Sequence, residues 1–290
     1  MHRLRVLLAA LLVAALALGL AACGDDDDSA SSTPDTTATS AAIPAVADLD
    51  LVSAGTLTIG TDKPAYPPYF EDDDPSNGRG FESAVGYAIA ERLGFARDQV
   101  KWVTVPFNSS YAPGKKNFDF DINQISITPK RAEQVDFSAP YYTSPQAVII
   151  AAGSDLDGVT DLAGLKDATF GVQVGTTSLD AVNDIVQPST QPRVYDNSND
   201  VVSALKNDQV DAVVVDLPTA YYLTAAEIEG GKILGQFAAP GGDDWGVVLA
   251  RGSGLTPAVD AAIAELRASG ELDRLTERWM GGNGAVPELS

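Results

Sequence analysis

The sequence predicts an α/β protein in two lobes, each a mainly parallel β-sheet flanked by helices. Short apolar runs alternate with segments of helical periodicity from about residue 51 onward. A second series of the same kind begins near residue 168. Repeated strand–helix units place helices over a parallel sheet, so two series indicate two sheets. The 290 residues suffice for two lobes of about 120 residues each.

The first series contains strands and one long helix. The helix has apolar residues at helical spacing and is followed by Gly94, which is typical of a helix C-terminus. These apolar residues are Phe81, Val85, Ala88, Ile89 and Leu93. Runs of β-branched and other apolar residues predict the strands. The strands are expected at 56–60, 102–105, 120–127 and 146–152.

The second series has more helices and leads to a helical C-terminal region. Strands are expected at 168–174, 193–195, 210–216, 232–237 and 245–250. Helices are expected at 178–186, 199–209, 218–228, 256–270 and 271–281. Pro218 suits the first position of its helix, because the N–H that proline lacks would have no helical partner there.

The charge and the cysteine content restrict the function. The formal net charge is −21, and the chain has a single Cys. So acidic a chain is not expected to bind nucleic acid or an anionic membrane surface in general. One Cys excludes a disulfide within the chain, so an apolar core must stabilise the fold.

The N-terminal region resembles that of a bacterial lipoprotein. Residues 1–22 combine a basic start, an apolar run and the sequence LAA before Cys23. This is typical of a secretory signal, and LAAC resembles the lipobox, in which the Cys is lipidated. The alternative is a plain signal or anchor helix with a chance Cys. Residues 23–50 are rich in Asp, Ser, Thr, Ala and Pro, so we predict a disordered tether.

Seven short motifs follow one another along the remaining chain. They are IGTDKPAYPPYFE (59–71), GFESAVGYAIAERLG (80–94), VTVPF (103–107), SITPKRAEQVDFSAPYY (126–142), GVQVGTTS (171–178), VDAVVVD (210–216) and LDRLTERW (272–279). Each motif alone is weak. Their order and spacing over about residues 54–281 resemble the extracellular solute-binding proteins of family 3, which serve ABC importers of polar amino acids.

The resemblance implies a fold, a function and a location. The fold would be the type II periplasmic-binding-protein fold, with two hinge crossings near 142–146 and 239–244. Lobe 1 would comprise 51–143 and 243–281, lobe 2 would comprise 144–242, and 282–290 would be a C-terminal tail. The protein would be a monomer without catalytic activity, cofactor or metal, which binds an amino acid and delivers it to an ABC transporter permease. It would lie outside the cytoplasm, lipid-anchored to the outer face of the cytoplasmic membrane or periplasmic.

Arg131 is the residue expected to bind the ligand carboxylate. Its planar guanidinium can donate two parallel hydrogen bonds to one carboxylate. Thr128 as N-cap and Pro129 as first helical residue would place Arg131 at a helix start, where anions are also favoured. The alternative is a surface salt bridge from Arg131 to Glu133 or Asp136.

Further polar residues are expected at the sheet edge where α/β proteins bind ligands. Thr176 and Thr177 on one lobe and Ser126 on the other would donate to the same carboxylate. Asp216 matches the family position that binds the ligand ammonium, with the carbonyl of Gln124 as a second acceptor. The alternative is that the threonines and Asp216 only cap helices.

Aromatic residues and one acid are expected around the ligand side chain. Tyr66 and Phe107 match the family's aromatic pair, which offers apolar and cation–π contact; Tyr69 is the alternative to Tyr66. Asp62 matches the position that contacts the far end of the side chain. A carboxylate there repels acidic ligands, so we predict a neutral polar amino acid, such as glutamine, or a basic one. Lys63 beside it opposes this inference.

One departure from the family pattern bears on function. Asn123 and Gln124 stand where small residues are common in the family, which puts the ligand size in question.

Two alternative functions remain open. The main one is a secreted dehydratase-like enzyme of the cyclohexadienyl or arogenate type, on the same fold, and the other is a sensor or adhesin lipoprotein. The mature chain would lack His2, the only His, so acid–base catalysis would fall to carboxylates or Lys, and no paired set is evident.

Overall fold

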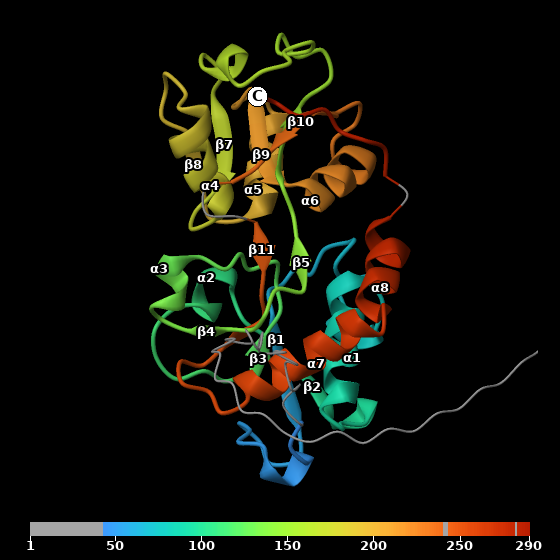
Figure 1. Ribbon diagram of the computed structural model, residues 1–290. Helices are drawn as coiled ribbons and strands as arrows, with labels where there is room; N and C mark the ends of the chain where they lie inside the picture. The colour runs from blue at the N-terminus through green and yellow to red at the C-terminus, as the bar shows by residue number, and fades with distance from the viewer. Residues whose placement is uncertain (1–42, 240–242, 282) are drawn as a thin grey trace, which may run out of the picture. The chain divides into compact units, whose positions relative to one another are not determined.

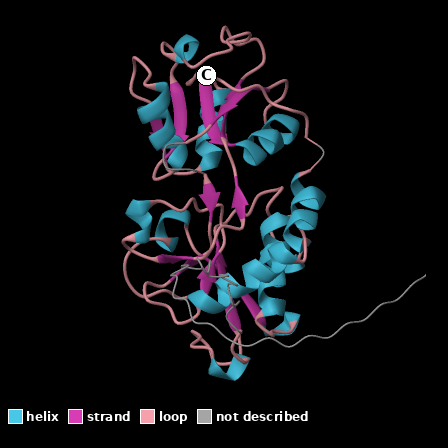
Figure 2. Ribbon diagram, in the orientation of Figure 1, coloured by secondary structure: helices cyan, strands magenta, loops and turns pink. Residues whose placement is uncertain are grey.

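Two five-stranded sheets organise the part of the chain that the structure describes (Figures 1 and 2). The computed structural model describes residues 43–239, 243–281 and 283–290. The predicted signal 1–22, the predicted lipidation site Cys23 and most of the predicted tether 23–50 therefore lie outside the described residues.

The first sheet has the strand order β2-β1-β3-β12-β4, and we call it and its helices the first lobe. Its strands are β1 (Leu57–Thr61), β2 (Val100–Thr104), β3 (Phe120–Asp121), β4 (Asp136–Phe137) and β12 (Val248–Leu249). Its helices are α1 (Phe81–Arg92), α2 (Phe107–Ser110), α3 (Pro129–Ala132), α7 (Thr256–Ala268) and α8 (Glu271–Met280).

The second sheet has the order β10-β6-β9-β7-β8 and defines the second lobe. Its strands are β6 (Gln146–Ile150), β7 (Phe170–Gln173), β8 (Arg193–Tyr195), β9 (Ala212–Asp216) and β10 (Lys232–Phe237). Its helices are α4 (Thr177–Ala181), α5 (Ser198–Lys206) and α6 (Leu217–Tyr222), and π-helical turns at Val182–Val186 and Leu223–Glu227 extend α4 and α6.

Both sheets are half parallel and half antiparallel, which differs from the mainly parallel sheets expected. In the first sheet β1 pairs parallel with β2 and β3, whereas β12 is antiparallel to its neighbours. In the second, β7 pairs parallel with β8 and β9, whereas β6 is antiparallel to its neighbours. A helical crossover gives a parallel neighbour, but β6 and β12 enter their sheets directly from the other lobe.

A two-stranded sheet marks both passages between the lobes. β5 (Tyr142–Thr143) and β11 (Asp244–Trp245) run antiparallel (Figure 1). Trp245 is fully buried there, and its ring centroid lies 4.8 Å from that of Tyr142. The lobe boundaries predicted from the sequence stay a prediction.

The strand expected at 120–127 is much shorter in the structure. β3 ends at Asp121, and Ser126 forms only an isolated bridge with Trp245. Between them Gln124 has a φ of +47°, in the left-handed region that a pleated strand does not visit. The strand expected at 245–250 is likewise divided into β11 and β12.

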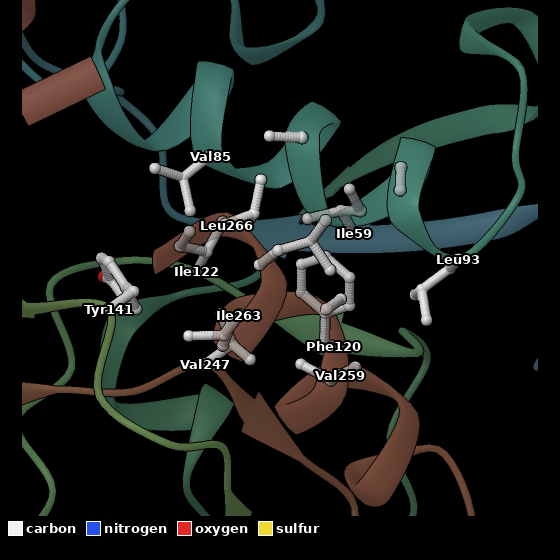
Figure 3. Close-up of a cluster of buried hydrophobic side chains, with 14 of the residues drawn as sticks. Ile59, Val85, Leu93, Phe120, Ile122, Tyr141, Val247, Val259, Ile263 and Leu266 are labelled. Carbon is white, nitrogen blue, oxygen red and sulfur yellow. The ribbon is translucent and has the colours of Figure 1, made fainter. Parts of the chain in front are cut away.

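The core of the first lobe lies between its sheet and two helices. Figure 3 shows side chains of α1 and α7 meeting those of β1 and β3. Ile59, Val85, Phe120 and Ile263 are fully buried in this cluster. The expected tether is partly packed here, because Ile43, Val46 and Leu49 contact the same core.

The second sheet is covered on both faces. In β6, Val148 and Ile150 belong to one apolar cluster, together with residues of α4. Ala147 and Ile149 belong to another, together with residues of α5 and α6. Alternate strand residues point to opposite faces, so helices bury the sheet from both sides, and only the ends of its strands are left for a site.

The C-terminal residues join the two lobes a third time. Met280, at the end of α8, belongs to the first core, whereas Leu289 is 4% exposed in a core of the second lobe. The backbone N–H of Leu289 donates to the carbonyl of Gln236 in β10 at 2.8 Å. Gly235 makes room for this contact, because a Cβ there would lie 2.4 Å from Leu289 Cγ.

None of the helices among the described residues is long and apolar enough to cross a membrane. Within the same residues, no group of three or more His, Cys, Asp and Glu side chains could hold a metal ion.

Candidate functional site

A cavity of about 150 Å³ is lined by residues of both lobes. All nine residues predicted to bind the ligand line it: Asp62, Tyr66, Phe107, Gln124, Ser126, Arg131, Thr176, Thr177 and Asp216. The first six belong to the first lobe and the last three to the second. The structure thus brings the predicted residues together, while their individual roles stay predictions.

The local structure around Arg131 agrees with the sequence. Thr128 is the N-cap of α3, its hydroxyl accepts from the Arg131 N–H at 3.2 Å, and Pro129 begins the helix. This part of the prediction is confirmed. However, α3 has only four residues, so few peptide dipoles add up, and the anion attraction expected of a helix start is small.

The guanidinium of Arg131 is buried and donates to backbone carbonyls. The residue is 7% exposed, and no described carboxylate forms a salt bridge with it, so the predicted alternative of a surface pair does not occur. Nη1 donates to the carbonyl of Ser126 at 2.7 Å, and Nη2 to that of Gly175 at 2.9 Å. Burial lowers the pKa of Arg131, because the charged form is poorly solvated.

Two aromatic rings lie against this guanidinium. Its Cζ atom is 4.5 Å from the ring centroid of Tyr111 and 5.6 Å from that of Phe107. The quadrupole of each ring attracts the cation, which partly replaces the lost water. The rings do not supply an anion, so the positive charge is available to one inside the cavity.

The two threonines differ in what their hydroxyls do. Thr176 caps α4, since its hydroxyl accepts from the Leu179 N–H at 3.2 Å and donates to the Gln173 carbonyl at 2.8 Å. Thr176 therefore does cap a helix, as the alternative interpretation of the sequence predicted. The hydroxyl of Thr177 lies 3.2 Å from that of Ser126, which puts donors of the two lobes beside each other.

Asp216 ends β9 and lies at the cavity wall. It stands at the N-cap position of α6, but its side chain makes no capping hydrogen bond. Instead, Oδ1 accepts from Nε2 of Gln146 at 2.7 Å. Burial raises the pKa of Asp216 to about 7. An ammonium group brought to this carboxyl would favour its charged form again.

Asp62 is held by the backbone rather than by a cation. Its carboxylate accepts from the N–H of Lys63 at 2.7 Å and from that of Phe107 at 3.1 Å. The Lys63 ammonium lies 3.2 Å from a carboxylate oxygen of Asp73. In the sequence, Lys63 beside Asp62 opposed the inference that Asp62 repels acidic ligands, but in the structure Lys63 pairs with Asp73.

The structure places Tyr66, and not Tyr69, at the cavity. Tyr69 is 2% exposed in the core; its hydroxyl lies 2.8 Å from that of Thr219, and its ring packs edge-on against Trp245. The ring centroid of Tyr66 is 6.5 Å from that of Tyr222 on the second lobe. An aromatic wall thus crosses the boundary between the lobes.

Gln124 and Asn123 also line the cavity. Gln124 is bound to Glu82 of α1: its backbone N–H donates to Oε1 at 2.6 Å, and its side-chain amide donates to Oε2. Its side chain is thus directed away from a ligand. Asn123 is 7% exposed, and its Nδ2 has no hydrogen-bond partner among the described residues.

Several lining residues were not predicted. They are polar side chains of the second lobe, namely Gln173, Asn197, Ser198, Asn199 and Thr219. The signal available was their position near the ends of predicted strands, where α/β proteins place ligands. Glu82 was also missed, although it belongs to the motif at 80–94, because a buried acid in a helix leaves no local signal.

Comparison with known proteins identifies the family. The sequence pattern of "Bacterial extracellular solute-binding proteins, family 3" matches residues 57–282. The L-cystine-binding protein TcyJ of Escherichia coli (strain K12) is 30% identical over 232 residues, which cover 78% of this chain and 83% of TcyJ. The ABC transporter glutamine-binding protein GlnH of Bacillus subtilis (strain 168) is 26% identical over 215 residues, 71% of this chain and 75% of GlnH.

A solved structure extends the likeness to three dimensions. An ancestral arginine-binding protein bound to glutamine superposes with a TM-score of 0.67 at 30% identity, covering 79% of this chain and 99% of the ancestral chain. The fold is accordingly that of two-lobed periplasmic amino-acid-binding proteins, as predicted. The family match spans nearly all of the residues that build the two sheets, and the chain therefore belongs to the bacterial extracellular solute-binding proteins of family 3.

Proposed function

We propose that this protein binds a polar amino acid, neutral or basic, in the cavity between its lobes and delivers it to the permease of an ABC importer. The proposal depends on one observation above all. A buried guanidinium without an acidic partner, Arg131, and a carboxyl group from the other lobe, Asp216, line the same cavity. A zwitterion carries the two opposite charges that such a pair can bind.

The relatives support the same function. The names of three similar proteins state that they bind cystine, glutamine or arginine. The name of one of them also states that it belongs to an ABC transporter. The cavity contains no second unpaired cation among the described residues, since Lys63 pairs with Asp73. An acidic side chain on the ligand would meet Asp62 instead, which repels it.

Ligand binding would favour closure of the lobes. The carboxylate would be bound by Arg131 and Ser126 of the first lobe and by Thr177 of the second, and the ammonium by Asp216. Only a closed arrangement makes both sets of contacts, so the ligand shifts the population toward it. The permease would then recognise the closed form. The hinge in this account is the β5–β11 pair, with lobe 1 at 51–143 and 243–281 and lobe 2 at 144–242.

We also propose that Cys23 is lipidated after removal of residues 1–22 and that 23–42 tethers a monomeric body to the membrane. The lipobox-like sequence before Cys23 supports this. Metabolic labelling with a fatty acid tests it: the wild type should carry the label and Cys23→Ala should not. Equal labelling of both would refute the anchor without affecting the binding proposal.

Thermal unfolding in the presence of single amino acids tests the binding. The twenty proteinogenic L-amino acids, ornithine and citrulline are each added to the purified protein. A ligand at 100 times its Kd should raise the free energy of unfolding by about 2.7 kcal/mol. A neutral polar or basic amino acid should do so. Stabilisation by glutamate or aspartate alone would contradict the role of Asp62, and no stabilisation by any of them would contradict the function.

The enzyme alternative has a separate test. A dehydratase would convert prephenate or arogenate to an aromatic product, which ultraviolet absorption detects. The acids in the cavity, Asp62 and Asp216, belong to different lobes, and the mature chain would have no His. We expect no turnover; formation of an aromatic product at a rate proportional to the protein concentration would overturn the proposal.

A further inference from the structure

Glu82 is a fully buried acid that binds one cavity residue twice. It is the second residue of α1 and is 0% exposed. Oε1 accepts from the backbone N–H of Gln124 at 2.6 Å and from the hydroxyl of Tyr141, and Oε2 accepts from the side-chain amide of Gln124. A buried carboxylate needs such donors, because burial without them is costly. Here most of them come from a residue 42 positions along the chain.

Gln124 is in a conformation that glutamine rarely adopts. Its φ of +47° lies in the left-handed region, where a Cβ is crowded. Such a residue persists where its surroundings fix it. The two hydrogen bonds to Glu82 fix both the backbone and the side chain of Gln124.

The turn at Gln124 determines where the following residues lie. β3 ends at Asp121, and the chain returns to pair with Trp245 only at Ser126. After this turn the carbonyl of Ser126 accepts from Arg131 at 2.7 Å, and the hydroxyl of Ser126 lies 3.2 Å from that of Thr177. An extended residue at 124 would move these groups off the cavity wall.

We infer that Glu82 is a positioning residue of the binding site: it holds Gln124 in the left-handed turn that places Ser126 and Arg131 for the ligand. Glu82 itself does not line the cavity and so acts through Gln124. The inference rests on the proposed amino-acid binding. The same carboxylate also binds Tyr141, which directly precedes the hinge strand β5, so it ties the binding turn to the hinge.

A double-mutant cycle tests this role. Glu82→Gln keeps the size of the side chain and one acceptor, but turns an N–H₂ group toward the amide of Gln124. Gln124→Gly removes the side-chain amide of residue 124. Glycine adopts a positive φ readily, because it has no Cβ. The coupling between residues 82 and 124 is therefore the difference between the effects of Glu82→Gln on the Kd in the wild type and in the Gln124→Gly variant. Calorimetric titration with L-arginine and with L-glutamine supplies the Kd values.

The expected results are specific. In the wild-type background Glu82→Gln should weaken binding of the better of the two amino acids at least tenfold. In the Gln124→Gly background, the same change should alter the Kd less than threefold. Ile89→Ala is the matched control, because Ile89 is a fully buried residue of α1 two turns from Glu82. It should lower the melting temperature while leaving the Kd within threefold of the wild type.

Three outcomes would decide against parts of this account. If Glu82→Gln binds as the wild type does, or if its effect is equally large in the Gln124→Gly background, Glu82 does not position the site through Gln124. If Ile89→Ala weakens binding as much as Glu82→Gln does, the effect is one of general stability. If none of the twenty amino acids stabilises the wild type in the thermal unfolding screen, the proposed function fails, and that screen shows this before any variant is titrated.

Discussion

The guanidinium of Arg131 donates to the carbonyl of Gly175 across the boundary between the lobes, with 2.9 Å between Nη2 and the oxygen. The hydroxyl of Tyr111 donates to the same carbonyl at 3.1 Å. Two first-lobe side chains thus bind one backbone group at the end of β7. Two of the five guanidinium N–H groups donate to backbone carbonyls, so other N–H groups can donate to an anion in the cavity.

Binding should strengthen as the pH rises toward neutrality. The pKa of Asp216 is raised to about 7 in the free protein, so below that pH its carboxyl is mainly neutral. The ligand ammonium prefers the ionised form, and binding should release a proton. The Kd should fall up to about tenfold per pH unit below pH 7 and level off above it.

Titrations in two buffers of different ionisation enthalpy measure the released proton. Arg131, Glu82 and Asp243 also influence Asp216, and Glu82 has a pKa raised to about 7 by its own burial. The variant Asp216→Asn distinguishes the titration of Asp216 from that of the neighbouring groups. This variant should bind the ligand weakly, and its Kd should lose most of the pH dependence. The same pH dependence in this variant would assign the effect to another group.

Asp62→Asn should change which ligands bind. A hydrogen bond to a charged group contributes about 1 kcal/mol more than one between neutral groups, so affinity for L-arginine should fall about fivefold. Affinity for L-glutamine should change little, and L-glutamate should bind better than it does to the wild type. Competition titrations measure the three ratios, and unchanged ratios would show that Asp62 does not contact the ligand side chain.

Leu289→Ala should destabilise the protein although it lies next to the last residue. Leu289 is 4% exposed in the second-lobe core, and removing a buried leucine side chain typically costs about 2–5 kcal/mol. Urea unfolding measures the loss. Ser290→Ala, at an exposed position, is the control and should stay within about 0.5 kcal/mol of the wild type. Equal stability of both variants would show that the tail does not contribute.

The sequence predicted the elements that depend on local pattern. The start of α3 was readable because Thr128 and Pro129 are each suited to one helical position. The motifs also indicated all nine residues that line one cavity, since most of them follow strands of the two sheets, and α/β proteins place ligands at the carboxyl ends of strands.

Features that depend on contacts distant in sequence were not predicted. The strand at 120–127 ends early because Gln124 turns, and that turn is fixed by Glu82 from another element. The hydrogen bond of Leu289 to Gln236 in β10 joins residues far apart in the chain. The sequence of a short C-terminal segment does not indicate which strand it contacts. The choice between Tyr66 and Tyr69 likewise required the packing of Trp245.

The most direct test of the central claim is calorimetric titration of Arg131→Ala with the amino acid that binds the wild type most tightly. Loss of two charge-assisted hydrogen bonds should weaken binding about 100-fold or more, while circular dichroism remains that of the folded wild type. Wild-type affinity in the folded variant would contradict the claim that Arg131 binds the ligand carboxylate.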